Sequence, residues 1–411
     1  MNCPETLKTS EGTLSQIFWG IDMQVKANLS RVLKAMREHR VGSHHFASVS
    51  GYGHNDLGRD TLDHVFASVM QAEAAAVRVQ FVSGTHAIAC ALFGILRPGD
   101  ELLTVAGAPY DTLEEVIGLR GNSQGSLKEF GVTYRELSLN MAGKLDWDRL
   151  AGAVSDRTRM ILIQRSCGYS WRRSLTITEI ERIVHTVKQQ KPDVICFVDN
   201  CYGEFVEDRE PTGVGADLMA GSLIKNPGGT IATTGGYIAG RAALVDAAMC
   251  RLTAPGIGSS GGSSLGQNRL FFQGLFLAPQ MVGEAMKGNA LIAATCADLG
   301  YPVNPPAEAQ QRDVIQAIQL GSREKLIAFC KAIQQQSPVD AYVEPVPAGM
   351  PGYESELVMA GGTFIDGSTS ELSADGPLRE PYIVYCQGGT HWTHVAIALE
   401  AAVAVIGRAD E

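Results

Sequence analysis

Lys225 and Asp199 are the residues of this 411-residue sequence whose types and positions point most directly to chemistry. Lys225 follows the apolar segment 218–224, an expected strand, and precedes a turn-forming Asn-Pro-Gly-Gly at 226–229. Asp199 follows the expected strand 194–198, one strand earlier. A buried lysine can lose its proton and attack a carbonyl as a neutral amine, and an acid opposite a heterocyclic nitrogen keeps that nitrogen protonated. Taken alone, Lys225 fits a surface lysine at a strand end better, because most lysines are exposed.

A second group of residues could bind a phosphate. Ser83, Gly84 and Thr85 precede an alanine-rich segment that is expected to be a helix up to Leu96. The free N–H groups and the dipole at a helix N-terminus attract an anion, and a glycine lets the backbone come close to it. Ser222 could add a hydroxyl group. A plain Ser/Thr helix cap is the alternative explanation.

Two aromatic residues could cover the face of a planar ring. Tyr110 lies in the turn after the expected strand 101–106, and His86 is its competitor. Asn200 and Tyr202, beside the candidate acid, could bond a phenolic oxygen or orient the carboxylate. Ordinary packing of the rings and an ordinary turn at the strand end are the alternatives.

An arginine is needed to bind the carboxylate of an amino acid. Arg379 precedes the expected strand 382–385, and its planar two-donor group suits a carboxylate. Arg165 and Arg172, after the expected strand 159–164, are its rivals. A lysine, an acid, a phosphate cradle, a flat partner and an arginine are together what pyridoxal 5′-phosphate (PLP) needs from an enzyme. The sequence therefore predicts PLP as cofactor and a small-molecule substrate that is an amino acid.

The elements that must position these residues alternate between strand and helix. Nearly continuous apolar strands between helices are typical of a parallel sheet covered on both faces, with functional groups at the carboxyl ends of its strands. The last third of the chain has a shorter, mixed pattern that predicts a smaller domain. The expected elements are a helix at 61–79, an extended piece at 79–82, a helix up to 96, strands at 101–106, 133–139, 159–164, 194–198 and 218–224, a helix at 177–189, a hairpin strand at 236–239 and a helix ending near 299.

Composition narrows the class of protein. A formal net charge of −10 without a basic stripe argues against a nucleic-acid partner. The apolar stretches are too short to cross a membrane, which predicts no membrane partner and a cytoplasmic location. The nine cysteines lie far apart, which predicts reduced and mostly buried thiols. His44, His45, His54 and His64 lack a clear ligand spacing, so no metal is predicted.

The chain resembles the methionine γ-lyase-like family often labelled aluminium resistance protein, a branch of the PLP enzymes of Cys/Met metabolism. The segments 197–205 and 221–229 carry the match most specifically, and the likeness covers nearly the whole chain. Further support comes from the segments 51–53, 82–87, 168–172 and 361–364.

The resemblance implies an α/β protein of the PLP-dependent transferase-like fold type I, with Lys225 binding PLP as an imine and Asp199 at the pyridine nitrogen. It implies a mostly parallel, seven-stranded type of sheet in a large domain at 51–290 and a smaller C-terminal α+β domain at 291–411. Residues 1–50 are expected to pack on the small domain or on a neighbouring subunit. A homotetramer or homodimer with shared active sites is implied, in which Tyr52 and Arg59 could reach a neighbour's phosphate.

The predicted reaction is cleavage of a C–S bond in a sulfur-containing amino acid, of the methionine γ-lyase or the cystathionine β-lyase kind. Lys225 would remove the α-proton, and Tyr110 could transfer a second proton. Aminotransfer or γ-replacement is an alternative, because the same parts support several outcomes. A non-enzymatic metal-tolerance or PLP-binding role is another.

Overall fold

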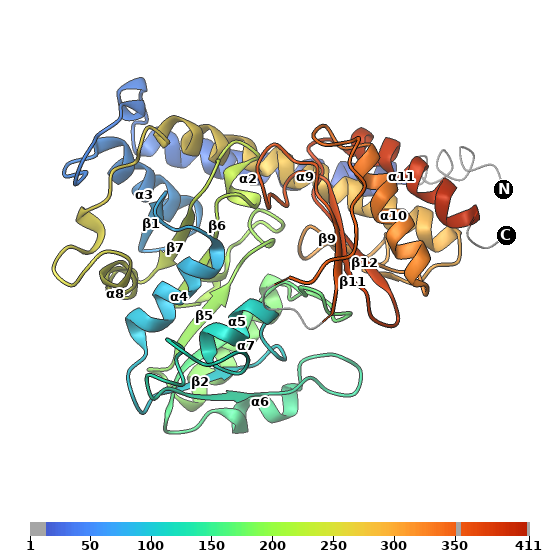
Figure 1. Ribbon diagram of the computed structural model, residues 1–411. Helices are drawn as coiled ribbons and strands as arrows, with labels where there is room; N and C mark the ends of the chain where they lie inside the picture. The colour runs from blue at the N-terminus through green and yellow to red at the C-terminus, as the bar shows by residue number, and fades with distance from the viewer. Residues whose placement is uncertain (1–13, 351–354, 409–411) are drawn as a thin grey trace.

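The computed structural model describes residues 14–350 and 355–408 (Figure 1). Cys3 and the rest of the first thirteen residues of the predicted segment 1–50 lie outside the described residues. The helices are α2 (Ser15–Glu38), α3 (Leu57–Val69), α4 (Gly84–Ile95), α5 (Asp111–Ile117), α6 (Trp147–Ala153), α7 (Ile177–Gln190), α8 (Ala242–Leu252), α9 (Asn268–Asp298), α10 (Arg323–Gln335) and α11 (Trp392–Arg408). The strands are β1 (Ala74–Arg78), β2 (Glu101–Thr104), β3 (Thr133–Glu136), β4 (Thr158–Gln164), β5 (Ile195–Asp199), β6 (Leu218–Ser222), β7 (Gly236–Gly240), β8 (Val303–Asn304), β9 (Ile315–Gln319), β10 (Leu357–Ala360), β11 (Ser373–Pro377) and β12 (Ile383–Gln387).

The first of two sheets has seven strands in the order β1-β7-β6-β5-β4-β2-β3. Its strands run parallel except β7, which pairs antiparallel with both β1 and β6. Helices cover both faces, since α4, α5 and α8 share one apolar core with the sheet and α3, α7 and α9 share another. The predicted α/β class and the predicted hairpin of β6 with β7 are confirmed.

Local sequence explains the central elements. Every residue of β5 is buried, as expected for a strand covered on both faces. Helix α7 begins with a capping box, in which Thr176 accepts from the backbone of Glu179 and the Glu179 carboxylate accepts from the backbone of Thr176. Its isoleucines and valines recur at helical spacing and face the sheet.

A five-stranded antiparallel sheet with the order β10-β11-β12-β9-β8 forms the C-terminal part, where it packs with α10 and α11 (Figure 1). Helix α9 connects the two parts: its residues up to Met286 belong to the core of the first sheet, and those from Ala290 belong to the core of the second. Helix α2 packs along α9. The exact domain limits at residues 50 and 290 stay predictions.

One predicted element was wrong. The expected helix at 61–79 ends at Val69, and Ala74–Arg78 forms strand β1, paired with β7. Alanine favours a helix, but Gln71 has a left-handed backbone (φ +58°) that ends the helix, and the ladder to β7 decides the rest. The expected extended piece at 79–82 is not a strand.

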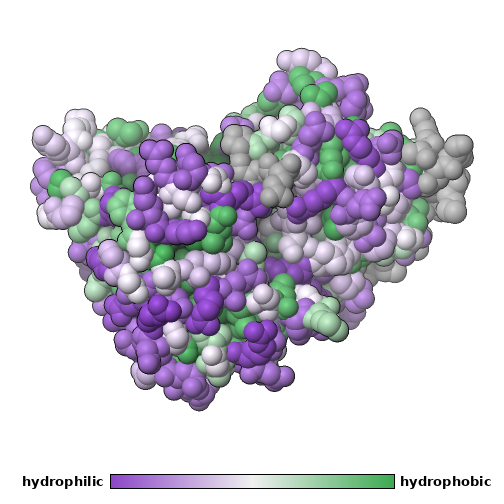
Figure 2. Space-filling view, turned by 60° about the horizontal axis from the view of Figure 1, so that its bottom comes forward, coloured by the Kyte–Doolittle hydropathy of each residue, from purple (hydrophilic) through white to green (hydrophobic). Residues whose placement is uncertain are grey.

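Three further observations concern the described part of the chain. No helix in it is long and apolar enough to span a membrane, and the cytoplasmic location stays a prediction. Its cysteines are free, and all but the half-buried Cys250 are buried, as predicted. On the face shown in Figure 2, small apolar groups lie scattered among polar residues.

Candidate active site

A cavity of about 470 Å³ lies where the strands of the first sheet end and the second sheet approaches. Its wall comes from the segments that follow β2, β4, β5 and β6, from the N-terminus of α4, and from residues of β9 and β12. This position at the carboxyl ends of parallel strands is where α/β proteins place their ligands. The lining residues that the sequence also singled out are Ser83, Gly84, Thr85, Tyr110, Arg172, Asp199, Tyr202, Ser222, Lys225 and Arg379.

Lys225 and Asp199 both line this cavity. Asp199 is the last residue of β5, and its Oδ1 accepts a hydrogen bond from the backbone of Cys201 at 3.1 Å. The sequence predicted Lys225 at the end of strand β6. This strand ends at Ser222, so Lys225 lies beyond it. The Lys225 Nζ lies 3.8 Å from the ring centroid of Tyr202. Tyr202 has φ +72°, a strained conformation for a bulky residue and one that clusters at functional sites.

The charges of this pair are set by opposing effects. Burial raises the pKa of Asp199, although Lys225 beside it works in the other direction. Burial by itself would lower the pKa of Lys225, but attraction to the acidic groups of Cys201, Tyr202 and Asp199 raises it above its ordinary value. In this environment the Lys225 pKa lies above and not below its ordinary value, so burial by itself does not make the neutral amine available as predicted.

The N-terminus of α4 lines the cavity with Ser83, Gly84 and Thr85, the residues predicted to bind a phosphate. The Ser83 Oγ caps the helix by accepting from the backbone of His86 at 3.1 Å, so the helix cap is present and the phosphate site stays a prediction. A Cβ on Gly84 would lie 3.1 Å from the Cβ of Ser222 and 3.2 Å from the Sγ of Cys201. The glycine thus allows the helix to approach the end of β6, which brings Ser222 to the predicted phosphate site.

Tyr110 lines the cavity and is held at both ends. Its backbone N–H donates to the Oε1 of Gln164 at 3.0 Å, and its hydroxyl lies 3.1 Å from the Oγ1 of Thr85. Burial, reinforced by Asp199, raises the Tyr110 pKa well above its usual value, so the phenol keeps its proton. His86 is not in the wall: its Nδ1 accepts from the backbone of Val82 at 3.2 Å.

The three candidate arginines differ in what they already bind. Arg172 lines the cavity, but its guanidinium donates to the carbonyls of Arg173 at 3.2 Å, of Gln164 at 3.0 Å and of Ser166. Arg165 is outside the cavity wall and fully buried. Arg379 is exposed at the cavity, and its Nη2 donates to the carbonyl of Tyr169 across 3.5 Å. Arg379 is thus the arginine with donors available for a substrate.

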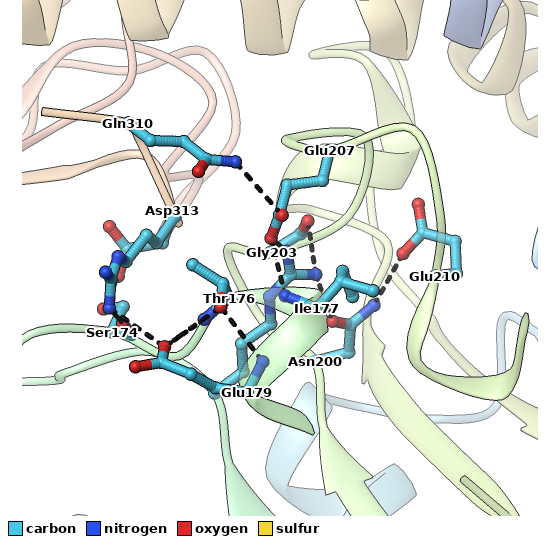
Figure 3. A network of polar contacts seen from close by, with 12 residues as sticks. Ser174, Thr176, Ile177, Glu179, Asn200, Gly203, Glu207, Glu210, Gln310 and Asp313 are labelled. Atoms are coloured by element: carbon cyan, nitrogen blue, oxygen red, sulfur yellow. Dashed lines mark hydrogen bonds and ion pairs between the residues drawn. The ribbon is translucent and has the colours of Figure 1, made fainter. Parts of the chain in front are cut away.

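Behind the cavity, a polar network holds the turn after β5 (Figure 3). The Arg165 guanidinium donates to Asn200 Oδ1 at 2.9 Å, to the Gly203 carbonyl at 2.8 Å and to Glu207 at 3.0 Å. The amide of Asn200 donates to Glu210 at 3.2 Å. Asn200 and Arg165 therefore shape the turn that carries Asp199 and Tyr202, and neither lines the cavity.

Tyr52 and Arg59 are not brought to the cavity of their own chain. Tyr52 is 83% exposed, and its carbonyl accepts from the backbone of Gly262 at 3.0 Å. Arg59 is buried and donates to the carbonyls of Gly53 and Gly262, each at 2.8 Å. Within this chain Arg59 ties two loops together, and Tyr52 projects outward.

Sequence reasoning missed several residues of the wall. Gln164, which orients Tyr110, ends β4 and could have been found by the same strand-end rule that found Asp199. Tyr169, Tyr385 and Gln387 also line the cavity. The latter two belong to the second sheet, and no local signal identifies them. Among the described residues no group of three or more His, Cys, Asp or Glu could hold a metal ion.

The geometry and the fold define the class first. The protein YhfS of Escherichia coli, described as PLP-dependent, shares the fold with a TM-score of 0.62 and 17% identity, over 94% of this chain and 97% of that one. The architecture is that of fold type I, and the cavity lies at its usual place for a ligand.

The chain belongs to the methionine gamma-lyase family, whose model matches residues 3–407. It is therefore an enzyme of the carbon–sulfur lyase kind, which argues against a non-enzymatic role.

Several proteins resemble the chain over nearly its full length. An uncharacterised protein of Bacillus subtilis, YnbB, is 50% identical over 97% of this chain and 96% of its own. A solved structure from Listeria monocytogenes, described as a candidate cystathionine beta-lyase involved in aluminum resistance, has a TM-score of 0.96 and 49% identity, over 98% of this chain and 100% of that one. A carbon–sulfur lyase involved in aluminum resistance from Clostridium novyi has a TM-score of 0.94 and 45% identity, over 98% and 96%.

Proposed function

We propose that this protein uses PLP to cleave the C–S bond of a sulfur-containing amino acid. The observation that carries the proposal is that one cavity gathers a lysine, a buried aspartate, a helix N-terminus with hydroxyl groups, a tyrosine and an available arginine. These are the groups that a phosphorylated, ring-shaped aldehyde and an amino acid require.

The residues fit the cofactor group by group. Lys225 would hold it covalently through Nζ, and Asp199 would face the ring nitrogen. The N-terminus of α4 with Ser83 and Ser222 would bind the phosphate, because its N–H groups and dipole favour an anion. Bound there, PLP supplies an electron-withdrawing ring that stabilises negative charge on the substrate carbon next to the amine.

The chain's own groups then carry the protons. Lys225, once released as the amine, accepts the proton of the substrate α-carbon at Nζ. Tyr110 is positioned by Gln164 and Thr85 and keeps its proton, so its hydroxyl can donate to the departing sulfur. Arg379 orients the substrate through its carboxylate.

A visible spectrum tests the cofactor. The purified protein is expected to show the imine band of PLP near ~420 nm, and Lys225→Ala is expected to lose it. Lys26→Ala, at an exposed position on α2, is the matched control and should keep the band. A wild-type protein without the band after incubation with PLP would refute the cofactor assignment.

Product analysis tests the reaction. Incubation with L-methionine or L-cystathionine is expected to release a thiol, a keto acid and ammonia. The identity of the keto acid separates β- from γ-elimination. If an added keto acid is converted to its amino acid and no free thiol appears, the reaction is aminotransfer instead.

We also infer a homodimer or homotetramer with shared active sites. Tyr52, Val82 and Leu265 are apolar side chains left 83%, 78% and 64% exposed, and Tyr52 and Leu265 flank the loops joined by Arg59. Sedimentation equilibrium should give a mass of two or four chains, and Tyr52→Asp should weaken the assembly. A monomer at micromolar concentration would contradict this inference.

A further inference from the structure

One face of the second sheet closes the cavity, and an acid lies within that face. Asp375 on β11 is paired directly with Tyr385 on β12, and Gln387 follows two residues later. Paired residues and residues two apart share a face of a sheet, so these three side chains lie together. Tyr385 and Gln387 line the cavity, whereas Asp375 lies behind them.

Asp375 is 5% exposed and is held by two neutral donors. Its Oδ2 accepts from the Tyr169 hydroxyl at 3.2 Å and from the Gln387 Nε2 at 2.8 Å. Burial raises the pKa of Asp375 to about 7, and these two hydrogen bonds work in the other direction.

The groups around Asp375 include no cation bonded to it in the described part of the chain. Arg379 follows β11, and its charge acts on Tyr385. The other titratable groups near Asp375 are tyrosines and buried thiols, namely Tyr169, Tyr202, Tyr385, Cys330 and Cys386. Arg379 is thus the neighbouring positive charge that opposes a proton on Asp375, and a carboxylate bound to Arg379 would offset that charge.

Gln387 has one end of its amide unused. The side chain is 3% exposed, and while Nε2 donates to Asp375, the buried Oε1 has no hydrogen-bond partner among the described residues. A buried acceptor without a partner is unfavourable. When Asp375 binds a proton, its hydroxyl can donate to Oε1 after a half-turn of the amide, because this terminal torsion is twofold. The amide N–H groups are then released from Asp375, and Gln387 is one of the residues that line the cavity.

Arg379 lies in the same neighbourhood. Its Nη2 donates to the Tyr169 carbonyl at 3.5 Å, and the Tyr169 hydroxyl donates to Asp375. An anion bound by Arg379 would also repel a charged Asp375, which favours the protonated acid.

We propose that Gln387 is a second binding group for the substrate carboxylate, beside Arg379, and that Asp375 positions it in the protonated state, so that carboxylate binding takes up a proton. The inference deepens the proposed function, since it requires an amino-acid substrate, but it does not depend on which bond is broken. The proton comes from solvent and stays on Asp375 while the carboxylate is bound.

Calorimetry with L-norleucine tests this inference. Norleucine carries CH₂ in place of the methionine sulfur and cannot release a thiol. Titration of the holoprotein in two buffers of different ionisation enthalpy, from pH 6 to 8.5, counts the protons bound. The wild type is expected to take up about one more proton above pH 7 than Asp375→Asn, and its affinity should fall about tenfold further per pH unit than that of the variant.

Two controls make the result specific. Tyr169→Phe removes a bond that favours the ionised acid, so it should move the fall in affinity to higher pH; it also serves if Asp375→Asn does not fold. Pentylamine, which is norleucine without its carboxylate, should show no proton difference between wild type and Asp375→Asn.

The outcomes separate the two proposals. Equal proton counts for norleucine in wild type and Asp375→Asn would overturn this inference and leave the lyase untouched. Proton-coupled norleucine binding in a protein that releases no thiol would refute the reaction and leave this inference standing. Failure of norleucine to bind the holoprotein would also overturn this inference, whereas the lyase is judged by thiol release alone.

Discussion

Glu204 offers a quantitative test of how burial acts in this protein. The side chain is fully buried behind the cavity, and its Oε1 accepts from the Tyr237 hydroxyl at 2.7 Å. Its Oε2 has no hydrogen-bond partner among the described residues. Burial raises the Glu204 pKa from 4.5 to about 8, with a further contribution from Glu210 and against the Tyr237 bond and Lys225. The folded protein therefore keeps Glu204 neutral at pH 7.

The sign and size of the effect on stability follow from this shift. Below pH 4.5 the group is protonated in both states and contributes no pH dependence. Between the two pKa values the unfolded chain ionises and the folded chain does not, so the free energy of unfolding falls by about 1.4 kcal/mol per pH unit. The loss levels off above pH 8, and between pH 6 and 9 it amounts to about 2–3 kcal/mol.

Glu204→Gln should remove this loss. The amide Oε1 can still accept from Tyr237, and glutamine does not ionise. Urea unfolding of both holoproteins from pH 6 to 9 should show the stability of the variant relative to wild type rising by about 2–3 kcal/mol. Tyr237→Phe, which removes a bond that lowers the Glu204 pKa, should extend the fall to higher pH before it levels off. Parallel stability curves for wild type and Glu204→Gln would refute the reasoning.

Three further predictions concern the site and its support. Ser83→Ala should cost about 1 kcal/mol of stability through loss of the α4 cap and should weaken PLP binding. Ser83→Thr should retain most of the stability and of the PLP affinity. Titration of the apoprotein with PLP measures the affinity, and an unchanged affinity in the alanine variant would contradict the proposed phosphate cradle. Arg379→Leu should raise KM for an amino acid about 10- to 100-fold with a smaller change in kcat, and an equal KM would remove this arginine from the substrate site. Lys287→Met should destabilise the fold by about 1–3 kcal/mol, because it removes the partner of the buried Glu284 at 3.1 Å, leaving that carboxylate the Trp392 backbone N–H at 3.0 Å, and breaks the 2.7 Å bond to Asp22 on α2; a thermal midpoint equal to wild type would show that the pairs contribute nothing.

Much of the first sheet followed from the sequence because its signals are local. The strands 159–164 and 194–198 are short apolar runs between helices, and they match β4 and β5 within a residue at each end. The capped helix α7 was equally direct. At Ala74–Arg78 the local signal pointed to a helix, and only pairing with β7 made it a strand.

The site divides in the same way. The sequence placed Asp199 and Lys225 after strands and the Ser83-Gly84-Thr85 turn at the start of a helix. Because parallel strands carry functional groups at their carboxyl ends, this placement predicted that these residues share one site. The choice between Arg172 and Arg379 could not be made from the sequence, because it depends on which guanidinium is already bound by backbone carbonyls.

The sequence by itself determined the α/β class, the family and the residue types of a PLP site, since these depend on periodicity and on motifs within a few residues. The tertiary structure decided what Lys225 experiences: three acidic groups beside it outweigh burial and raise its pKa. It also decided that Gln387 lines the cavity with Asp375 behind it, because only the packing of the second sheet against the first brings residues so far apart in the chain to one wall.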